Sequence, residues 1–293
     1  MDEQLIALYH RHVAMAFDRQ LRFADFLSRK EAGKKWQYDI ETATLSFGKL
    51  KFEAPIVGSH AHNNNSWLWA WSNKNLKLTL TNRALGDTVR ATVHRLGVHP
   101  LAAPGFSLEP LLGSELTESA PHVLGAILSR ELEFDAYYLT PYDGGCGLVL
   151  VRDDRLKLNE KHPLRRILTV APQVISALSV YDHKAAFTHY ARDYGVSVGE
   201  EPHQVKLLSG KDSLTATFDD RDRLTKLEGT VQPEDPPAKK SPPKAAKGKT
   251  NTKPAKKAVA KPAAKKLTKK PAPKPAKNAK KTATPAKKPG KKR

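Results

Sequence analysis

The chain has 293 residues, a formal net charge of +20 and a hydrophobic content of 39%. This length is enough for a large buried core, and a single cysteine excludes a disulfide framework within the chain. The first residues, Met1-Asp2-Glu3, lack the basic and apolar regions of a signal peptide, and the longest uncharged apolar stretch, residues 167–181, is too short to span a bilayer. We therefore expect a cytoplasmic protein without a membrane span.

The positive charge is confined to one end of the chain. Residues 233–293 hold 21 Lys and one Arg against Glu234 and Asp235, whereas residues 1–232 hold 28 basic and 28 acidic residues. The tail consists mostly of Lys, Pro and Ala and has no aromatic residue, so it cannot bury enough apolar surface to fold alone. The sequence predicts a globular domain at 1–232 and a disordered polycationic tail at 233–293.

The first part of the body begins with a long helix and continues with short strands. Residues 2–30 place apolar side chains at three- and four-residue spacing, which is typical of an amphipathic helix. Alternation of apolar and polar residues then predicts strands at 36–40, 45–47, 50–52 and 66–72. A second helix is expected at 82–96, because the helical period returns there.

The second part of the body mixes helices and strands in blocks. Helices are expected at 114–130, 163–178 and 183–194. Strands are expected at 134–139, 147–151, 204–208, 214–218 and 224–231. Because the elements do not alternate strictly, the pattern favours an α+β fold in one globular body, with an N-terminal helix, antiparallel strands and several helices.

Three tryptophans alternate in the strand expected at 66–72. Trp67, Trp69 and Trp71 would point to one face of that strand. A solvent-facing row would make a stacking platform for bases, but no basic residues are interleaved, which favours a core-facing row. The preceding residues 59–65 (SHAHNNN) are then interpreted as a polar loop leading into a core strand.

A pair of histidines in this loop is a weak candidate for a metal site. His60 and His62 have the two-residue spacing that places both imidazoles on one face of an extended segment. No third or fourth ligand can be assigned, since His94, His99 and His122 are candidates by residue type only. Two ordinary surface histidines are the simpler interpretation, so we expect neither a metal nor another cofactor.

Acidic residues suggest a weak candidate for a ligand pocket. Glu131, Glu133 and Asp135 alternate and would share one face of a strand, where paired carboxylates can divide acid and base roles. A pocket lined by Trp69, Glu133 and Asp135 would support a small-molecule-binding or catalytic body. A solvated strand face is the simpler interpretation, because no base, nucleophile or metal motif accompanies the row.

Other features do not strengthen the case for an enzyme. Cys146 lies in a glycine-rich segment without a neighbouring cation to activate its thiol, and Arg83, Arg90 and His94 are typical of a solvated helix face. The sequence has no P-loop, G-x-G-x-x-G, G-x-S-x-G, H-E-x-x-H, EF-hand or C-x-x-C motif. These absences favour a non-enzymatic protein; a protein-interaction module remains a further alternative.

The tail itself favours contact with a polyanion. Lysines that pair with phosphates release condensed counterions, and without aromatic residues or arginine forks the tail would recognise backbone rather than sequence. DNA and RNA are the expected partners, and DNA would place the protein at the nucleoid. The expected phosphate-binding residues are Lys239, Lys240, Lys244, Lys253, Lys256, Lys257, Lys265, Lys266, Lys269, Lys270, Lys280, Lys281, Lys287, Lys288, Lys291 and Lys292.

Two resemblances accompany these patterns. The tail segments Lys-Pro-Ala-Lys-Lys-Ala at 253–258, Thr-Pro-Ala-Lys at 284–287 and Ser-Pro-Pro-Lys at 241–244 resemble linker-histone tails and those of lysine-rich bacterial DNA-binding proteins, which implies charge-driven DNA binding. The segment Trp-Leu-Trp-Ala-Trp-Ser-Asn at 67–73, with Gly58 before it, resembles an uncharacterised bacterial family. That resemblance implies a folded bacterial domain and carries no assigned activity.

Overall fold

The computed structural model describes residues 1–30, 35–117 and 119–230. The chain divides into two units, Met1–Pro236 and Pro237–Arg293, and all elements described below belong to the first. The polycationic tail and its lysines lie outside the described residues. No helix in the described ranges is long and apolar enough to cross a membrane.

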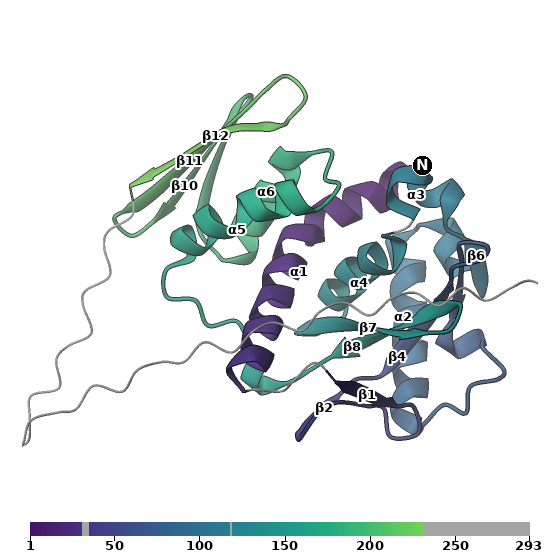
Figure 1. The fold of residues 1–293 in the computed structure, drawn as a ribbon. Coiled ribbons are helices and arrows are strands. Elements are labelled where there is room, and N and C mark those ends of the chain that lie inside the picture. Colours follow the sequence, from purple (N-terminus) through teal and green to yellow (C-terminus); the bar gives the residue numbers. More distant parts are fainter. Residues whose placement is uncertain (31–34, 118, 231–293) are drawn as a thin grey trace, which may run out of the picture. The chain divides into compact units, whose positions relative to one another are not determined.

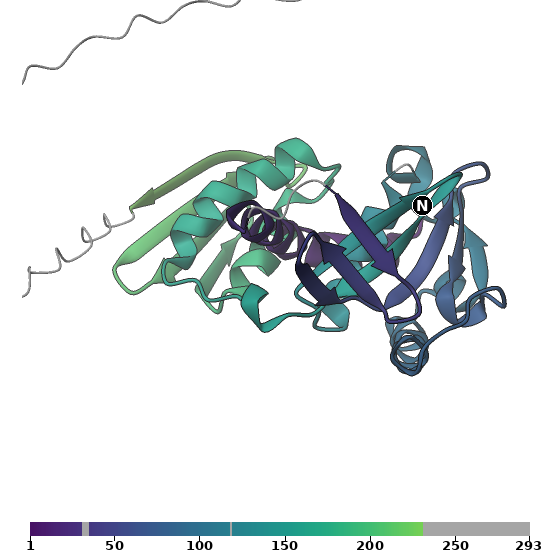
Figure 2. The ribbon, with the colours of Figure 1, turned by 60° about the horizontal axis from the view of Figure 1, so that its bottom comes forward.

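A long N-terminal helix runs through the described fold. Helix α1 (Glu3–Arg29) begins at Asp2, whose carboxylate accepts a hydrogen bond from the backbone N–H of Leu5 at 2.9 Å. Its 27 residues contain neither glycine nor proline, which is why it continues without a break. The helix contacts α4 and β7 on one side and α5 and α6 on another, so it joins the two halves of the fold (Figures 1 and 2).

The remaining helices are shorter and have recognisable ends. They are α2 (Leu80–Leu96), α3 (Glu109–Thr117), α4 (Ala120–Glu131), α5 (Pro163–Ala177) and α6 (His183–Asp193). Thr79 caps the start of α2 and Gly97, with a φ of 72°, ends it. The single helix expected at 114–130 is wrong: α3 spans Gly113, which has non-helical angles, and a separate helix α4 begins with Pro121 in its first turn.

Within residues 35–117 and 119–230 the strands form three sheets, and the strand pairs there are all antiparallel. The first sheet contains β1 (Trp36–Asp39), β2 (Thr44–Phe47) and β3 (Leu50–Glu53) in that order. The second has the order β6-β5-β4-β8-β7, with β4 (Ile56–Ala61), β5 (Ser66–Trp69), β6 (Gly105–Ser107), β7 (Ala136–Tyr142) and β8 (Gly145–Val151). The third has the order β12-β11-β10-β9, with β9 (Ser197–Glu201), β10 (Gln204–Ser209), β11 (Asp212–Phe218) and β12 (Leu224–Thr230). Because the described residues form helices together with antiparallel sheets, the structure confirms the expected α+β class.

The five-stranded sheet is the centre of the core. All seven residues of β8 are buried, because both faces of this strand are covered. Leu148 and Leu150 belong to the larger apolar cluster that includes residues of α1 and α4, whereas Val149 and Val151 pack with residues of β2 and β3. The sheet is therefore enclosed by helices on one face and by the first sheet on the other (Figure 2).

Strand β4 was missed by the sequence patterns, and its neighbour β5 is shorter than expected. Residues 59–61 belong to β4, so the polar loop expected at 59–65 is wrong for its first three residues. A Cβ added to Gly58 would lie 2.6 Å from the ring of Trp67, so the glycine is what lets this indole lie flat over β4. The strand expected at 66–72 ends at Trp69, and Ala70–Ser72 form a short 3-10 helix.

Candidate functional site

The tryptophans contribute to the core rather than to an exposed platform. Trp67 is 1% exposed and Trp69 is fully buried, which confirms their inward orientation. The indole N–H of Trp69 donates to the carbonyl of Leu101 at 2.9 Å, while Trp71 stacks on Trp69 at a centroid distance of 4.6 Å. Trp67 and Trp69 are therefore unavailable to stack on bases, whereas Trp71, expected on the same strand face, lies in the 3-10 helix and is half-buried.

A cluster of two histidines and one cysteine lies where β4 ends and β8 begins, and we call it the His–His–Cys cluster (His60, His62 and Cys146). The register of the two strands places Cys146 directly opposite His60. One ligand atom from each of the three residues lies within 4.8 Å of the others, and the two imidazole rings are 5.2 Å apart. The sequence predicted the histidine pair but not the cysteine, which comes from a different hairpin.

Close backbone approach holds the two hairpin ends together. The backbone N–H of His62 donates to the carbonyl of Gly144 at 2.9 Å, extending the pairing beyond the last residue of β4. A Cβ added to Gly145 would lie 2.3 Å from the carbonyl oxygen of His60, so no other residue fits there without moving a strand. This contact keeps Cys146 in register with His60.

The cluster is half enclosed. His60 is 3% exposed and Cys146 is 6% exposed, whereas His62 is exposed. Neither ring nitrogen of His60 has a hydrogen-bond partner within the described ranges. Burial, followed by the neighbouring His62, lowers the pKa of His60, while the Asn65 side chain, which lies near the ring but outside hydrogen-bonding geometry, acts in the opposite direction; burial raises the pKa of Cys146. The enclosed side of the cluster thus holds a neutral imidazole and a neutral thiol.

The pocket residues expected from the sequence are not brought together. Trp69 lies in β5 and Asp135 lies just before β7, and two strands separate β5 from β7 in the sheet. Glu133 is exposed in a turn with a φ of 57°. Asp135 accepts a hydrogen bond from the backbone N–H of Asp153 at 2.9 Å, which is a structural contact. These three residues do not line one cavity.

The acidic row is also not a strand face. Glu131 ends α4, and the next residues form a turn, so Glu131, Glu133 and Asp135 do not alternate on a strand. Glu131 binds His12 at 2.8 Å and Arg95 at 3.1 Å. Although burial opposes it, these two contacts lower the pKa of Glu131. Its carboxylate is therefore committed to joining α1, α2 and α4.

The other candidate histidines lie away from the His–His–Cys cluster. His94 and His99 are exposed, on and just after α2. His122 is paired with the hydroxyl of Tyr137 at 3.1 Å and lines a small cavity of about 230 Å³ together with Gln20 and apolar residues. His122 is exposed to solvent by its accessible area, and desolvation where it packs against the cavity lowers its pKa below the ordinary value.

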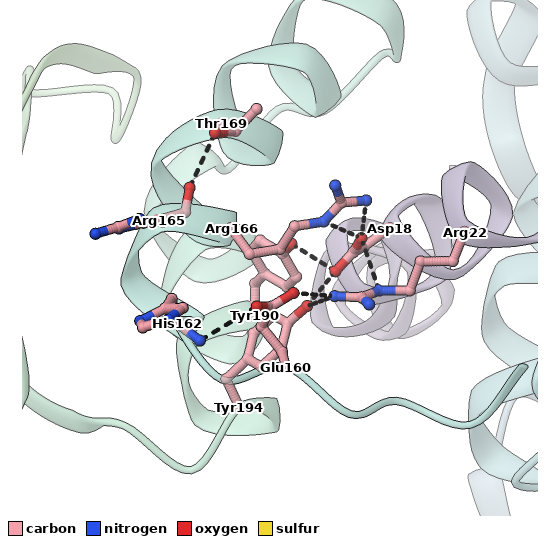
Figure 3. A network of polar contacts seen from close by, with 9 residues as sticks. All are labelled: Asp18, Arg22, Glu160, His162, Arg165, Arg166, Thr169, Tyr190 and Tyr194. Atoms are coloured by element: carbon pink, nitrogen blue, oxygen red, sulfur yellow. Dashed lines mark hydrogen bonds and ion pairs between the residues drawn. The ribbon is translucent and has the colours of Figure 1, made fainter. Parts of the chain in front are cut away.

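A second polar cluster, which the sequence did not predict, is centred on a buried aspartate (Figure 3). Asp18 of α1 is fully buried and accepts from Arg166 Nε at 2.7 Å and from the hydroxyl of Tyr190 at 2.9 Å. Tyr194 donates to the same carboxylate, and Arg22 Nε lies 3.4 Å from it. We call these five residues the Asp18 network.

Both carboxylate oxygens of Asp18 are fully partnered, which favours a structural role, although the Nε of Arg22 makes only an ion pair and no hydrogen bond within the described residues. Glu160 binds Arg22 at 2.7 Å, so two carboxylates balance two guanidinium groups. Burial, followed by a hydrogen bond to Asp18, raises the pKa of Tyr194 to about 12, so this phenol stays a donor at neutral pH. Every oxygen of Asp18 has a partner, and none is left for a ligand. The network joins α1 to α5 and α6.

The comparisons with known proteins concern the first half of the chain. No curated protein matches the sequence, and no solved structure does. Residues 6–154 match a family of unknown function, a segment that holds the first two sheets and all three residues of the His–His–Cys cluster but not α5, α6 or the third sheet. Because this match covers about half of the chain, the chain belongs to that family of unknown function, DUF6882.

Proposed function

We propose that the protein binds nucleic acid through its C-terminal residues 233–293 and thereby tethers its α+β body to DNA at the nucleoid. The observation that carries this proposal is the separation of charge: the tail has a net charge of +20, and the rest of the chain is neutral. Association with a polyanion would therefore be driven by one segment, through release of counterions from the phosphates.

The composition of the tail supports backbone contact without sequence preference. Its cations are lysines except for Arg293, and no tail residue is aromatic. Lysine is a point charge that lacks the bidentate fork with which arginine recognises guanine, and bases cannot stack on a chain without aromatic rings. Contacts of this kind position a protein on nucleic acid but do not discriminate between base pairs.

The described part of the body gives the proposal indirect support. Of the three tryptophans that could have stacked on bases, Trp67 and Trp69 are buried in the core, and the half-buried Trp71 stacks on Trp69. Base stacking by these two rings is therefore not available as a second binding mode. In this proposal the tail raises the local concentration of the body near nucleic acid, and the body contributes little affinity.

The test is a fluorescence-anisotropy titration of labelled duplex DNA at several salt concentrations. Three proteins are compared: the full chain, a chain ending at residue 232, and a full-length control whose tail lysines are replaced by glutamine. If six or more lysines contact phosphates at once, the logarithm of the binding constant falls with the logarithm of salt with a slope steeper than about −5.

The expected result is steep salt dependence for the full chain and little binding by the other two proteins. Two duplexes of unrelated sequence should give affinities that agree within about twofold, since backbone contacts do not read bases. Titration of single-stranded DNA and an RNA hairpin distinguishes the two nucleic acids. Equal binding by the chain ending at residue 232, or a shallow salt slope, would refute the proposal.

A further inference from the structure

We propose that the His–His–Cys cluster is a transition-metal site, with His60, His62 and Cys146 as ligands of a zinc ion. This inference is independent of the tail and concerns only the body. Imidazole nitrogen and cysteine sulfur are the ligand types that zinc prefers, and they distinguish the site from the all-oxygen sites of calcium and magnesium.

The buried ring of His60 lacks hydrogen-bond partners among the residues that the structure describes. Its side chain is buried, yet within the described part of the chain neither ring nitrogen has a hydrogen-bond partner. A buried polar group without a partner destabilises the fold, so two on one ring need a physical explanation. A metal ion bound to one ring nitrogen of His60 provides the partner which that nitrogen lacks. The nearby Asn65 side chain can then orient the other ring nitrogen, as outer partners of metal-bound histidines do.

The spacing of the three ligand atoms also fits a metal ion. His60 and Cys146 face each other across β4 and β8, and such cross-strand pairs have Cβ atoms about 4.5 to 5.5 Å apart. His62 follows two residues after His60, and its ring lies 5.2 Å from that of His60. All three ligand atoms are within 4.8 Å of one another. Zinc bonds of roughly 2.0 to 2.3 Å require a separation of about 3.5 Å, so the cluster must contract by about 1 Å.

At least one of the three ligands can move to bring the donor atoms closer. His60 and Cys146 are fixed by strand pairing and burial, whereas His62 is exposed and lies just beyond the end of β4. Rotation of the His62 side chain between rotamers shifts its ring without disturbing the sheet. The backbone of His62 stays anchored by its hydrogen bond to Gly144, so the ligand remains close to the site.

The surroundings of the cluster close one side and leave the other open to solvent. Trp67, paired with His60 across β4 and β5, closes one side of the cluster with a buried indole whose ring lies against Gly58 and whose N–H has no hydrogen-bond partner among the described residues. The exposed His62 lies on the open side. The cluster therefore offers three protein ligands and leaves a fourth coordination position towards solvent. This is the arrangement of an open zinc site, in contrast to structural sites, which are closed by four protein ligands.

The experiment uses the full chain, purified without a polyhistidine tag and stripped of metal with a chelator. Zinc binding is measured by competition with a chromophoric indicator, and cobalt(II) is added separately as a spectroscopic probe of the same site. We expect one metal ion per chain and a cobalt spectrum with a near-ultraviolet thiolate charge-transfer band and intense visible bands typical of tetrahedral geometry.

The variants are H62Q and C146S, with H94Q as the matched control. His94 is also an exposed histidine, but it lies on α2 and is not part of the cluster. H62Q should weaken zinc binding at least about tenfold, since even outer partners of metal ligands contribute that much, and C146S should remove the charge-transfer band. H94Q should match the wild type in both measurements.

Two outcomes would overturn the proposal. One is wild-type protein whose cobalt spectrum lacks the thiolate band or shows only the weak bands of octahedral cobalt. The other is zinc affinity in H62Q and C146S equal to that of H94Q, which would mean adventitious binding elsewhere. Far-ultraviolet circular dichroism checks the fold of each variant. If C146S does not fold, the wild-type cobalt spectrum and the H62Q comparison still decide the question.

Discussion

Replacing Asp18 with asparagine should destabilise the body by about 3 to 5 kcal/mol, the usual effect of leaving a buried charge without its partner. The Asp18 carboxylate is fully buried and contacts Arg166 at 2.7 and 2.5 Å. An asparagine of the same shape removes the negative charge and turns an amide N–H₂ towards guanidinium and phenol donors. Arg22 keeps its ion pair with Glu160, so the loss falls mainly on Arg166.

The assay is urea unfolding of the full chain followed by tryptophan fluorescence and circular dichroism. At an unchanged m value, the loss appears as a lower midpoint, and in thermal unfolding as a decrease in Tm of roughly 6 to 20 °C. Asp25→Asn is the matched control: Asp25 is exposed on the same helix, and its replacement should change stability by less than about 0.5 kcal/mol. A loss below about 1 kcal/mol for Asp18→Asn would refute the argument that this carboxylate holds α1 to α5 and α6.

Two further predictions concern packing and pH. Gly58→Ala should lower the free energy of unfolding in urea by about 1 to 3 kcal/mol, because the added Cβ would lie 2.6 Å from the Trp67 ring. Gly199→Ala is the control, since the nearest atom there is 3.8 Å away, and it should lower this free energy by less. Equal losses in the two variants would contradict this reasoning. Desolvation at the cavity lowers the pKa of His122 below its ordinary value of 6.5, so the unfolded chain binds this proton more tightly and stability decreases as pH falls below about 6.5; because His122 is exposed, we expect this effect to be small. Urea midpoints between pH 5 and 8 should therefore vary less in His122→Gln than in the wild type or in His94→Gln, and an unchanged pH dependence in His122→Gln would contradict the assignment.

The local features of the fold could be predicted from the sequence because they depend on periodicity and turn chemistry. The helix expected at 82–96 is observed at 80–96, and the strand expected at 50–52 is observed at 50–53. The inward orientation of Trp67 and Trp69 also followed, since alternate residues of a strand share a face. The helix expected at 114–130 failed because α3 ends at Thr117 and α4 begins again at Ala120 with Pro121 in its first turn, although the apolar spacing continues across both.

The candidate sites were harder to predict, because they depend on contacts between segments far apart in the chain. Strand β4 has no alternating pattern and was interpreted in part as a loop, so its pairing with β8 could not be foreseen. Asp18 lies in an amphipathic helix where a charged residue is normally solvated, and only the packing of α5 and α6 against α1 buries it. Glu133 and Asp135, expected in one pocket with Trp69, were separated by the strand order.

The sequence by itself determined the division of the chain into a neutral body and a polycationic tail, because charge and composition need no coordinates. It also determined that His60 and His62 lie close together, since they are two residues apart. The tertiary structure alone decided that Cys146 joins them. The reason is strand register: the close approach at Gly145 aligns two hairpins that local patterns treat as independent, and this alignment turns an ordinary histidine pair into a site with three ligands.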